Sequence, residues 1–138
     1  MIHSKSAVRT RVRYAETDQM GVAYYGTYPT WLEIARTEYC RERGVDYREI
    51  EREGTGLVVA EVWVRYRRPV QYDDEIIISV WVSETGRRTM TFCYEIHKDG
   101  ELCSEAYTKH VFVDMMSKRP VAAAPDLVNR LTSNPEAD

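Results

Sequence analysis

The sequence predicts an α+β fold in which one long helix lies against an antiparallel sheet of about five strands. Three observations support this prediction. One stretch of helical periodicity runs from Pro29 to Arg43. Runs with the two-residue period of strands lie on both sides of it, at 8–14, 57–67, 75–82, 88–97 and 101–114. The order of strand, helix and then four strands favours a sheet whose neighbours are antiparallel.

The composition is that of a soluble globular chain. Its 138 residues fit a single domain, 1–138, with a tail from about Thr132 that is expected to fray. Hydrophobic residues make up 43% and charged residues 30%. A net charge of −3 makes a nucleic-acid partner unexpected. No signal peptide or bilayer-spanning apolar run is present, so we expect a cytoplasmic protein without membrane insertion.

The cysteines and histidines give no sign of a metal centre. The three cysteines share no CxxC spacing, and the three histidines form neither an HxxH nor an HExxH pattern. Free thiols, with no disulfide and no metal site, are the expected state. No metal or redox cofactor is predicted.

The first strand is expected at 8–14, where apolar residues and arginines alternate. Val8, Thr10, Val12 and Tyr14 fall on one face of this strand. The opposite face carries three arginines, which predicts that it faces solvent.

The helix is expected to begin at Pro29, because proline suits the first helical position and biases Tyr28 away from helical geometry. Gly44 follows the helix where a left-handed cap belongs, with Val45 folding back on the last turn. An apolar stripe recurs at helical spacing, and the polar residues, Arg36 and Arg43 among them, are expected on the other sides. The stripe comprises Trp31, Leu32, Ala35, Tyr39 and Cys40.

The remaining elements are bounded by turn residues. The segment Tyr47–Arg52 has the pattern of one helical turn, and Pro69 ends the long strand that follows it. Asp99-Gly100 predicts a tight hairpin between the last two strands, since both residues tolerate positive φ. Asp126 is a possible cap for a short helix at 127–131.

One segment between the first strand and the helix has the residues for chemistry. Asp18 lies in a turn punctuated by Gly21 and Gly26. A carboxylate that faces free backbone N–H groups can attack a polarised carbonyl or activate water for that attack. The duller interpretation is that Asp18 only caps its turn, which is common for aspartate beside glycine. Spacing alone does not decide between them.

The same segment resembles a known family. The runs YAETDQMGVAYYGTY (14–28), WLE (31–33) and ARTE (35–38) resemble the hotdog-fold acyl-CoA thioesterases, and specifically the 4-hydroxybenzoyl-CoA thioesterase branch that includes the YbgC-like proteins. The resemblance implies a long helix wrapped by a curved antiparallel sheet. It also implies a homodimer joined edge to edge, commonly paired into a homotetramer, with sites at the dimer interface.

The resemblance further implies roles for individual residues. Asp18 corresponds to the catalytic carboxylate, as nucleophile or general base, and the backbone amide near Tyr25 polarises the thioester carbonyl. For the basic pair Arg87 and Arg88, the resemblance implies a contact with coenzyme A phosphates, and solvated strand ends are the alternative. Tyr24 and Tyr28 flank Gly26 before the helix, so these three are candidates for substrate binding, with the core or the dimer interface as the alternative for the tyrosines. Coenzyme A enters as part of the substrate. Two departures are that some relatives have a second aspartate where this chain has Glu16, and many have a histidine at Tyr25.

Alternatives remain open at this point. Glu33 is a second candidate carboxylate, because other hotdog branches use one on the helix. A non-catalytic acyl-thioester binding module would share the same fold. A nuclear-transport-factor type domain is disfavoured because it normally opens with helices. A hydratase would pair a histidine with the carboxylate, and none lies near Asp18 in sequence.

Overall fold

The computed structural model describes residues 4–134 and has the predicted order of elements. The strands are β1 (Ser6–Arg11), β2 (Thr55–Tyr66), β3 (Glu75–Thr85), β4 (Thr89–Lys98) and β5 (Glu101–Asp114), and the helices are α1 (Tyr28–Glu42), α2 (Tyr47–Arg52) and α3 (Pro125–Leu131). Two short 3₁₀ turns, η1 (Tyr14–Glu16) and η2 (Tyr25–Thr27), lie between β1 and α1. No helix among these residues is both long enough and apolar enough to cross a bilayer.

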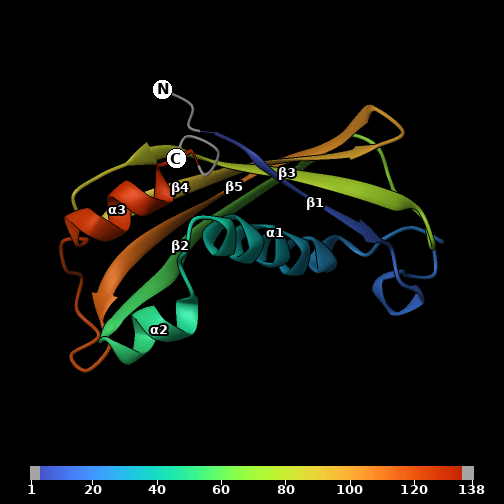
Figure 1. The fold of residues 1–138 in the computed structure, drawn as a ribbon. Helices are drawn as coiled ribbons and strands as arrows, with labels where there is room; N and C mark the ends of the chain where they lie inside the picture. Colours follow the sequence, from blue (N-terminus) through green and yellow to red (C-terminus); the bar gives the residue numbers. More distant parts are fainter. Residues whose placement is uncertain (1–3, 135–138) are drawn as a thin grey trace.

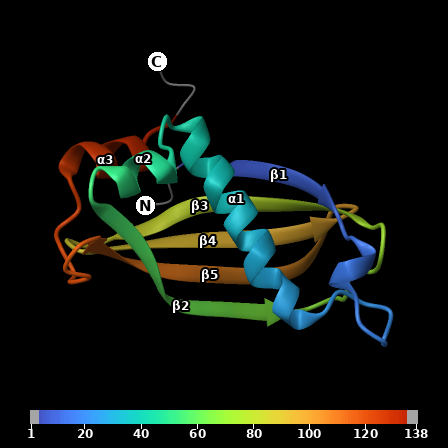
Figure 2. The same cartoon turned by 90° about the horizontal axis from the view of Figure 1, so that it is seen from below.

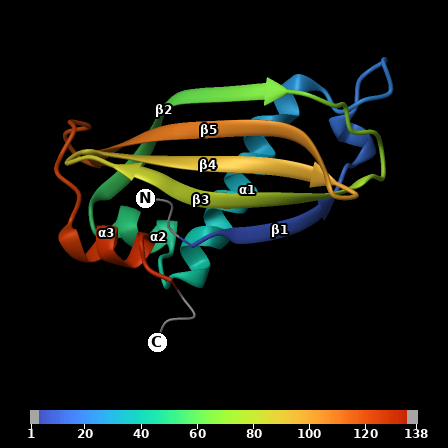
Figure 3. The same ribbon diagram turned by 90° about the horizontal axis from the view of Figure 1, so that it is seen from above.

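The five strands form one antiparallel sheet in the order β1-β3-β4-β5-β2. Figures 1 and 2 show α1 lying across one face of this curved sheet. Seen from the other side, in Figure 3, no helix of residues 4–134 covers the opposite face. The predicted α+β fold, a long helix wrapped by a five-stranded antiparallel sheet, is confirmed.

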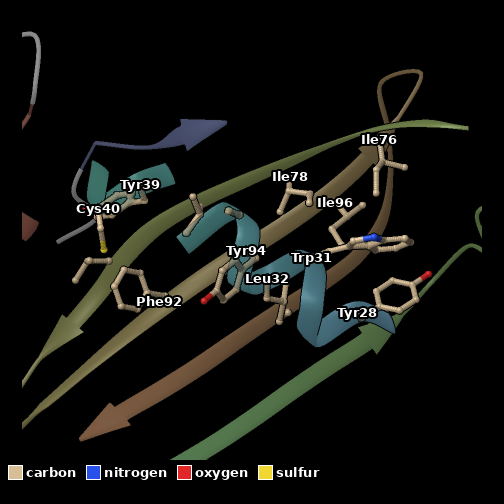
Figure 4. Close-up of a cluster of buried hydrophobic side chains, with 14 of the residues drawn as sticks. Tyr28, Trp31, Leu32, Tyr39, Cys40, Ile76, Ile78, Phe92, Tyr94 and Ile96 are labelled. Atoms are coloured by element: carbon tan, nitrogen blue, oxygen red, sulfur yellow. The ribbon is translucent and has the colours of Figure 1, made fainter. Parts of the chain in front are cut away.

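The core lies between α1 and the inner face of the sheet. The inward residues of β3 are Ile76, Ile78, Val80 and Val82, all fully buried, as the alternation predicted. Figure 4 shows side chains of α1 and of the strands meeting in this layer. The inward residues of β4 are equally buried: Met90, Phe92, Tyr94 and Ile96. A buried aliphatic or aromatic side chain contributes about 1.5–3 kcal/mol, so this layer supplies most of the stabilisation of the fold.

Two of the predicted turns are confirmed by their backbone geometry. Gly44 has a φ of +73°, and the Val45 N–H donates to the Cys40 carbonyl, which closes the helix cap. Asp99 and Gly100 both have positive φ, at 50° and 79°, as the hairpin requires.

Three local predictions are wrong. β1 ends at Arg11, because the chain turns into η1 and leaves Tyr14 exposed to solvent. Tyr28 has helical angles and begins α1, because Pro29 fits within the first turn, where no N–H is needed. The N-cap residue of α3 is Ala124, and Pro125 occupies the first helical position. Asp126 therefore lies inside the first turn.

The placement of two arginines is also corrected. Arg36 and Arg43 were expected on the polar sides of α1, but they are only 9% and 6% exposed. Both follow the apolar stripe at intervals of three or four residues, Arg36 after Leu32 and Arg43 after Tyr39. Their aliphatic stems therefore lie in the core layer, and their guanidinium groups need polar partners there.

The first residues of the tail that was expected to fray make hydrogen bonds. The Thr132 hydroxyl donates to the Val128 carbonyl at 2.8 Å, and the Ser133 carbonyl accepts from the side chain of Arg43 at 3.0 Å. The rest of the tail that was expected to fray, residues 135–138, lies outside the described residues.

Candidate active site

Asp18 lies in a tight exposed loop between β1 and α1. Its N–H donates to the Val22 carbonyl at 3.0 Å, and its carbonyl accepts from the Gly21 N–H at 3.0 Å. Gly21 has a φ of +80°, which closes the loop without strain. The Asp18 Oδ1 accepts the Met20 N–H at 2.9 Å, whereas Oδ2 has no hydrogen-bond partner among the described residues. Asp18 therefore caps its turn with one oxygen and presents the other to solvent.

Glu16 fixes this loop to the helix. Its carboxylate is almost fully buried and accepts the Trp31 indole N–H at 3.0 Å. It also accepts the Arg13 backbone N–H at 2.8 Å and forms an ion pair with the Arg13 guanidinium at 2.9 Å. Burial alone would raise the pKa of Glu16, but these hydrogen bonds outweigh it and lower the pKa below its usual value. Glu16 is therefore held ionised as a structural latch for the Asp18 loop.

Free backbone donors lie at the start of the helical segment. The Tyr24 N–H donates to the Glu16 carbonyl, and the next paired amide is that of Thr27. The N–H groups of Tyr25 and Gly26, in between, have no hydrogen-bond partner among residues 4–134. The partial positive charge of the helix start favours a negative oxygen in front of them. The prediction that a backbone amide near Tyr25 polarises a thioester carbonyl concerns these two N–H groups.

The turn with the free amides is tied to the edge of the sheet. Tyr66, the last residue of β2, donates its hydroxyl hydrogen to the Tyr25 carbonyl at 3.1 Å. Its ring also packs edge-on against Tyr28, with the centroids 4.8 Å apart. Tyr66 therefore positions the turn through this hydrogen bond and this ring contact. Its place in the sequence gave no reason to expect such a role.

Of the two aromatic residues singled out for substrate binding, one is exposed and one is buried. The ring of Tyr24 lies over Gly26 and 4.6 Å from the ring of Tyr25. Interaction with the Tyr25 hydroxyl raises the pKa of Tyr24, and the charge of Asp18 adds to the shift. Tyr28 is only 3% exposed, and it lines a depression near η2. This depression is lined by Val22, Ala23, Tyr25, Tyr28, Tyr66, Arg67, Arg68 and Pro69.

We expect Gly26→Ala to reduce hydrolysis without unfolding the protein. An added Cβ would lie 2.6 Å from Cε2 of Tyr24, so that ring must move away from its place beside the free amides. Alanine has a higher helix propensity than glycine, so the free energy of unfolding should stay within about 1 kcal/mol of wild type. A decrease of about tenfold in kcat/KM is expected, as for a displaced binding group.

Asn129→Ala is the control, because Asn129 is exposed on α3, at the end of the sheet opposite the loop between β1 and α1. Chemical denaturation and thioester hydrolysis should be measured for both variants. Full activity of Gly26→Ala would show that the Tyr24 side of the turn plays no part in the reaction.

Arg87 and Arg88 do not lie near Asp18 in the same chain. They occupy the β3–β4 turn, which Figure 2 shows at one end of the sheet, with the loop between β1 and α1 at the other. Both side chains are exposed, and their carbonyls accept the N–H groups of Ala123 and Phe112. A single protomer therefore does not bring this basic pair to the candidate site.

The two alternative catalytic groups also lie away from the Asp18 loop. Glu33 is exposed on the second turn of α1. His110 is buried in the core, where it shares a hydrogen bond with the Thr108 hydroxyl at 2.8 Å and packs edge-on against Phe92. Burial and the charge of Arg36 lower the pKa of His110 to about 3. None of these contacts pairs a histidine with Asp18, as a hydratase would need.

Comparison with known proteins agrees with this architecture. The family model for the thioesterase-like superfamily matches residues 12–131. The protein YneP of Bacillus subtilis (strain 168) is 32% identical over 111 residues, which cover 80% of each chain. The acyl-CoA thioester hydrolase YbgC of Escherichia coli O157:H7 is 29% identical over 119 residues, covering 86% of this chain and 89% of YbgC.

A solved structure extends the match to the fold. The DHNA-CoA thioesterase from Staphylococcus aureus superposes with a TM-score of 0.87 at 31% identity, covering 91% of this chain and 87% of that one. The family model covers nearly the whole chain, and the superposition covers 91% of it. The chain belongs to the thioesterase-like superfamily and is an enzyme of the thioesterase class with a hotdog fold.

Proposed function

We propose that this chain hydrolyses acyl-CoA thioesters to a free acid and coenzyme A, with Asp18 as the essential carboxylate. The observation that carries the proposal is an unpaired oxygen of Asp18 on the loop that leads into two unpaired amides, those of Tyr25 and Gly26. YbgC is an acyl-CoA thioester hydrolase and the Staphylococcus aureus enzyme is a DHNA-CoA thioesterase, and both support the substrate class.

Two routes are open to the Asp18 carboxylate. As a nucleophile, it attacks the thioester carbonyl carbon, the C–S bond breaks with release of the coenzyme A thiolate, and water then hydrolyses the mixed anhydride. As a general base, it takes a proton from a water molecule that attacks the same carbon. In both routes the amides of Tyr25 and Gly26 stabilise the negative oxygen of the tetrahedral intermediate. Neither route needs a metal or redox cofactor.

The edge strand β2 supports the proposal of a homodimer. It is twelve residues long and lies at the end of the strand order, so one side of its backbone is unpaired within the protomer. Its apolar side chains are exposed on both faces: Val58, Val59, Val62, Trp63 and Tyr66 are each between 42% and 51% exposed. A long, apolar, unprotected edge is a template for pairing with a second strand. We therefore assign the dimer contact to the β2 strands of two protomers. The cytoplasm is the proposed location of this dimer.

The same dimer would bring Arg87 and Arg88 of one protomer to the candidate site of the other. Antiparallel pairing of two β2 strands about a two-fold axis reverses the partner's sheet. The partner's β3–β4 turn then lies at the end of the assembly that holds the first protomer's Asp18. The exposed guanidinium groups at that turn suit coenzyme A phosphates, because arginine donates two parallel hydrogen bonds to phosphate oxygens.

The outer face of the sheet is the corresponding candidate for pairing dimers into a homotetramer. A row of side chains crosses this uncovered face at matching register: Trp63, Tyr107, Cys93 and Trp81. The rings of Trp63 and Tyr107 are stacked, with centroids 5.6 Å apart. Large apolar side chains on an open face are typical of a surface that a second copy covers.

We expect the double substitution of Val58→Lys and Trp63→Lys on β2 to produce monomers with little activity. Lysine on an edge strand repels its symmetry mate and discourages pairing. Thr91→Lys with Ser79→Lys is the matched control, because it adds the same charge to the outer face of the interior strands β4 and β3, where it should separate dimers from one another but leave each dimer intact. Sedimentation velocity should show loss of the dimer only for the β2 variant. An unchanged dimer in that variant would exclude β2 as the contact.

The proposed activity is tested by a thiol-release screen over short, long and aromatic acyl-CoAs. Hydrolysis of at least one class well above the uncatalysed rate is expected. A flat response over the whole panel, combined with saturable acyl-CoA binding, would instead identify a binding module on the same fold.

A further inference from the structure

Arg36 is a buried cation with no counter-ion among the described residues. Only 9% of its surface is exposed, and no carboxylate within residues 4–134 lies within 4.0 Å of its guanidinium. Its Nη1 donates to the Tyr94 hydroxyl at 3.1 Å, and that hydroxyl in turn shares a hydrogen bond of 2.6 Å with Thr108. His110, the next polar group along this chain of contacts, stays neutral in the core. The hydroxyl of Tyr47 also interacts with this guanidinium. An arginine has five N–H donors, so some of those on Arg36 remain available beyond these two hydroxyls.

Arg36 lines a groove that starts near the candidate active site. The groove runs between α1 and β2, and its lining includes Pro29, Glu33, Arg36, Val59, Val62 and Thr108. Pro29, Glu33 and Arg36 are spaced four and three residues apart, so they share one face of α1. Seven residues of helix correspond to about 10 Å, which sets the separation between the first turn of α1 and Arg36. The valines of β2 form an apolar wall along this distance.

Charge is unevenly distributed along the groove. Glu33 lies at its middle, exposed and without an ion-pair partner among the described residues, and Arg36 lies one turn farther from the amides. A second groove on the α2 side of Arg36 carries Glu33 and Glu51. An anionic group is therefore repelled near Glu33 and attracted only where it contacts the Arg36 guanidinium directly.

We propose that Arg36 is a specificity-determining residue that binds a carboxylate at the far end of the acyl group. This inference rests on the proposed thioester hydrolysis, with the carbonyl at the amides of Tyr25 and Gly26. The acyl chain then lies along the valine wall, and its terminal carboxylate forms two charge-assisted hydrogen bonds with the guanidinium. The substrate class is an acyl-CoA that bears a second, distal carboxylate. Pairing with such a group offsets the cost of leaving a charge buried and unpaired.

The test compares suberyl-CoA with octanoyl-CoA, which have the same chain length and differ in the terminal carboxylate. Wild type should have the higher kcat/KM on suberyl-CoA. Arg36→Gln should lower that value by about tenfold or more while changing the value for octanoyl-CoA by less than about twofold. Arg36→Lys, which retains the charge without the forked donors, should lose less selectivity than Arg36→Gln. Arg41→Gln, an exposed arginine on the same helix, is the matched control and should change neither value.

A second measurement separates this inference from the proposed function. Free suberate should raise the Tm of wild type more than free octanoate does, and Arg36→Gln should abolish the difference. If wild type hydrolyses neither thioester and suberate still stabilises it through Arg36, only the proposed function fails. If octanoyl-CoA is hydrolysed and Arg36→Gln affects both substrates equally or neither, Arg36 has a structural role and the inference is wrong. An altered oligomeric state without altered selectivity would likewise assign Arg36 to the subunit contact.

Discussion

Asp18→Asn should reduce acyl-CoA hydrolysis by about 10² to 10⁴-fold, the usual contribution of a nucleophile or positioned base, while leaving the fold intact. Asparagine retains the oxygen that accepts the Met20 N–H, so the turn itself should not change. It lacks the negative charge needed either to attack the carbonyl or to accept a proton from water. The measurement is kcat/KM on the best substrate of the screen, together with the denaturation midpoint.

Asp114→Asn provides the matched control for this experiment. Asp114 also caps a turn, accepting the N–H groups of Met116 and Ser117 at 2.9 Å each, but it lies at the end of β5, at the opposite end of the sheet from Asp18 of the same protomer. Its substitution should leave activity unchanged. If Asp18→Asn retains more than half of the wild-type activity, the bland interpretation of Asp18 as a turn cap is the right one.

The second large effect is expected for Arg43→Met, and it concerns stability. The Arg43 side chain is fully buried and donates to the Ser4 carbonyl, the Ser6 hydroxyl, the Tyr39 carbonyl and the Ser133 carbonyl at 2.8–3.0 Å. Methionine fills similar space but leaves these oxygens without their donor. We expect a loss of about 3–5 kcal/mol in the free energy of unfolding, as for other broken buried charge networks.

Arg41→Met is the control for the Arg43 experiment. Arg41 lies two residues earlier on the exposed side of α1, where its ion pair with Glu38 is open to solvent. Removing such a pair should cost less than about 1 kcal/mol. Urea denaturation of both variants separates the two cases, and equal losses would contradict the assignment of Arg43 as a buried clamp.

The fold was largely predictable because its signals are local. The strict alternation in β3 and β4 identifies which side chains face the core, and Asp99-Gly100 identifies the hairpin by its backbone requirement alone. The arginines of α1 were misplaced because charge was taken as a sign of solvent. Each follows a buried residue by four positions, Arg36 after Leu32 and Arg43 after Tyr39, and this spacing indicates the buried face of α1.

The candidate site was predictable only in part. Asp18 and the amide near Tyr25 are close in sequence, so a motif and a turn were enough to nominate both. The supporting contacts are not local. Glu16 reaches Trp31 across fifteen residues, and Tyr66 reaches Tyr25 across forty-one. A single sequence has no periodicity that encodes such contacts, and it says nothing of what a second copy contributes.

The hydrogen bond from Tyr66 to the Tyr25 carbonyl has a consequence for how the enzyme responds to dilution. It connects the strand proposed to join two protomers with the turn proposed to hold the reacting oxygen. If two protomers associate through β2, a ligand that stabilises the ordered turn also favours association of the protomers. Ordering of the turn and dimerisation are then linked by mass action. Activity per chain then falls as the concentration drops below the dimer dissociation constant, and a bound transition-state analogue shifts this fall to lower concentration.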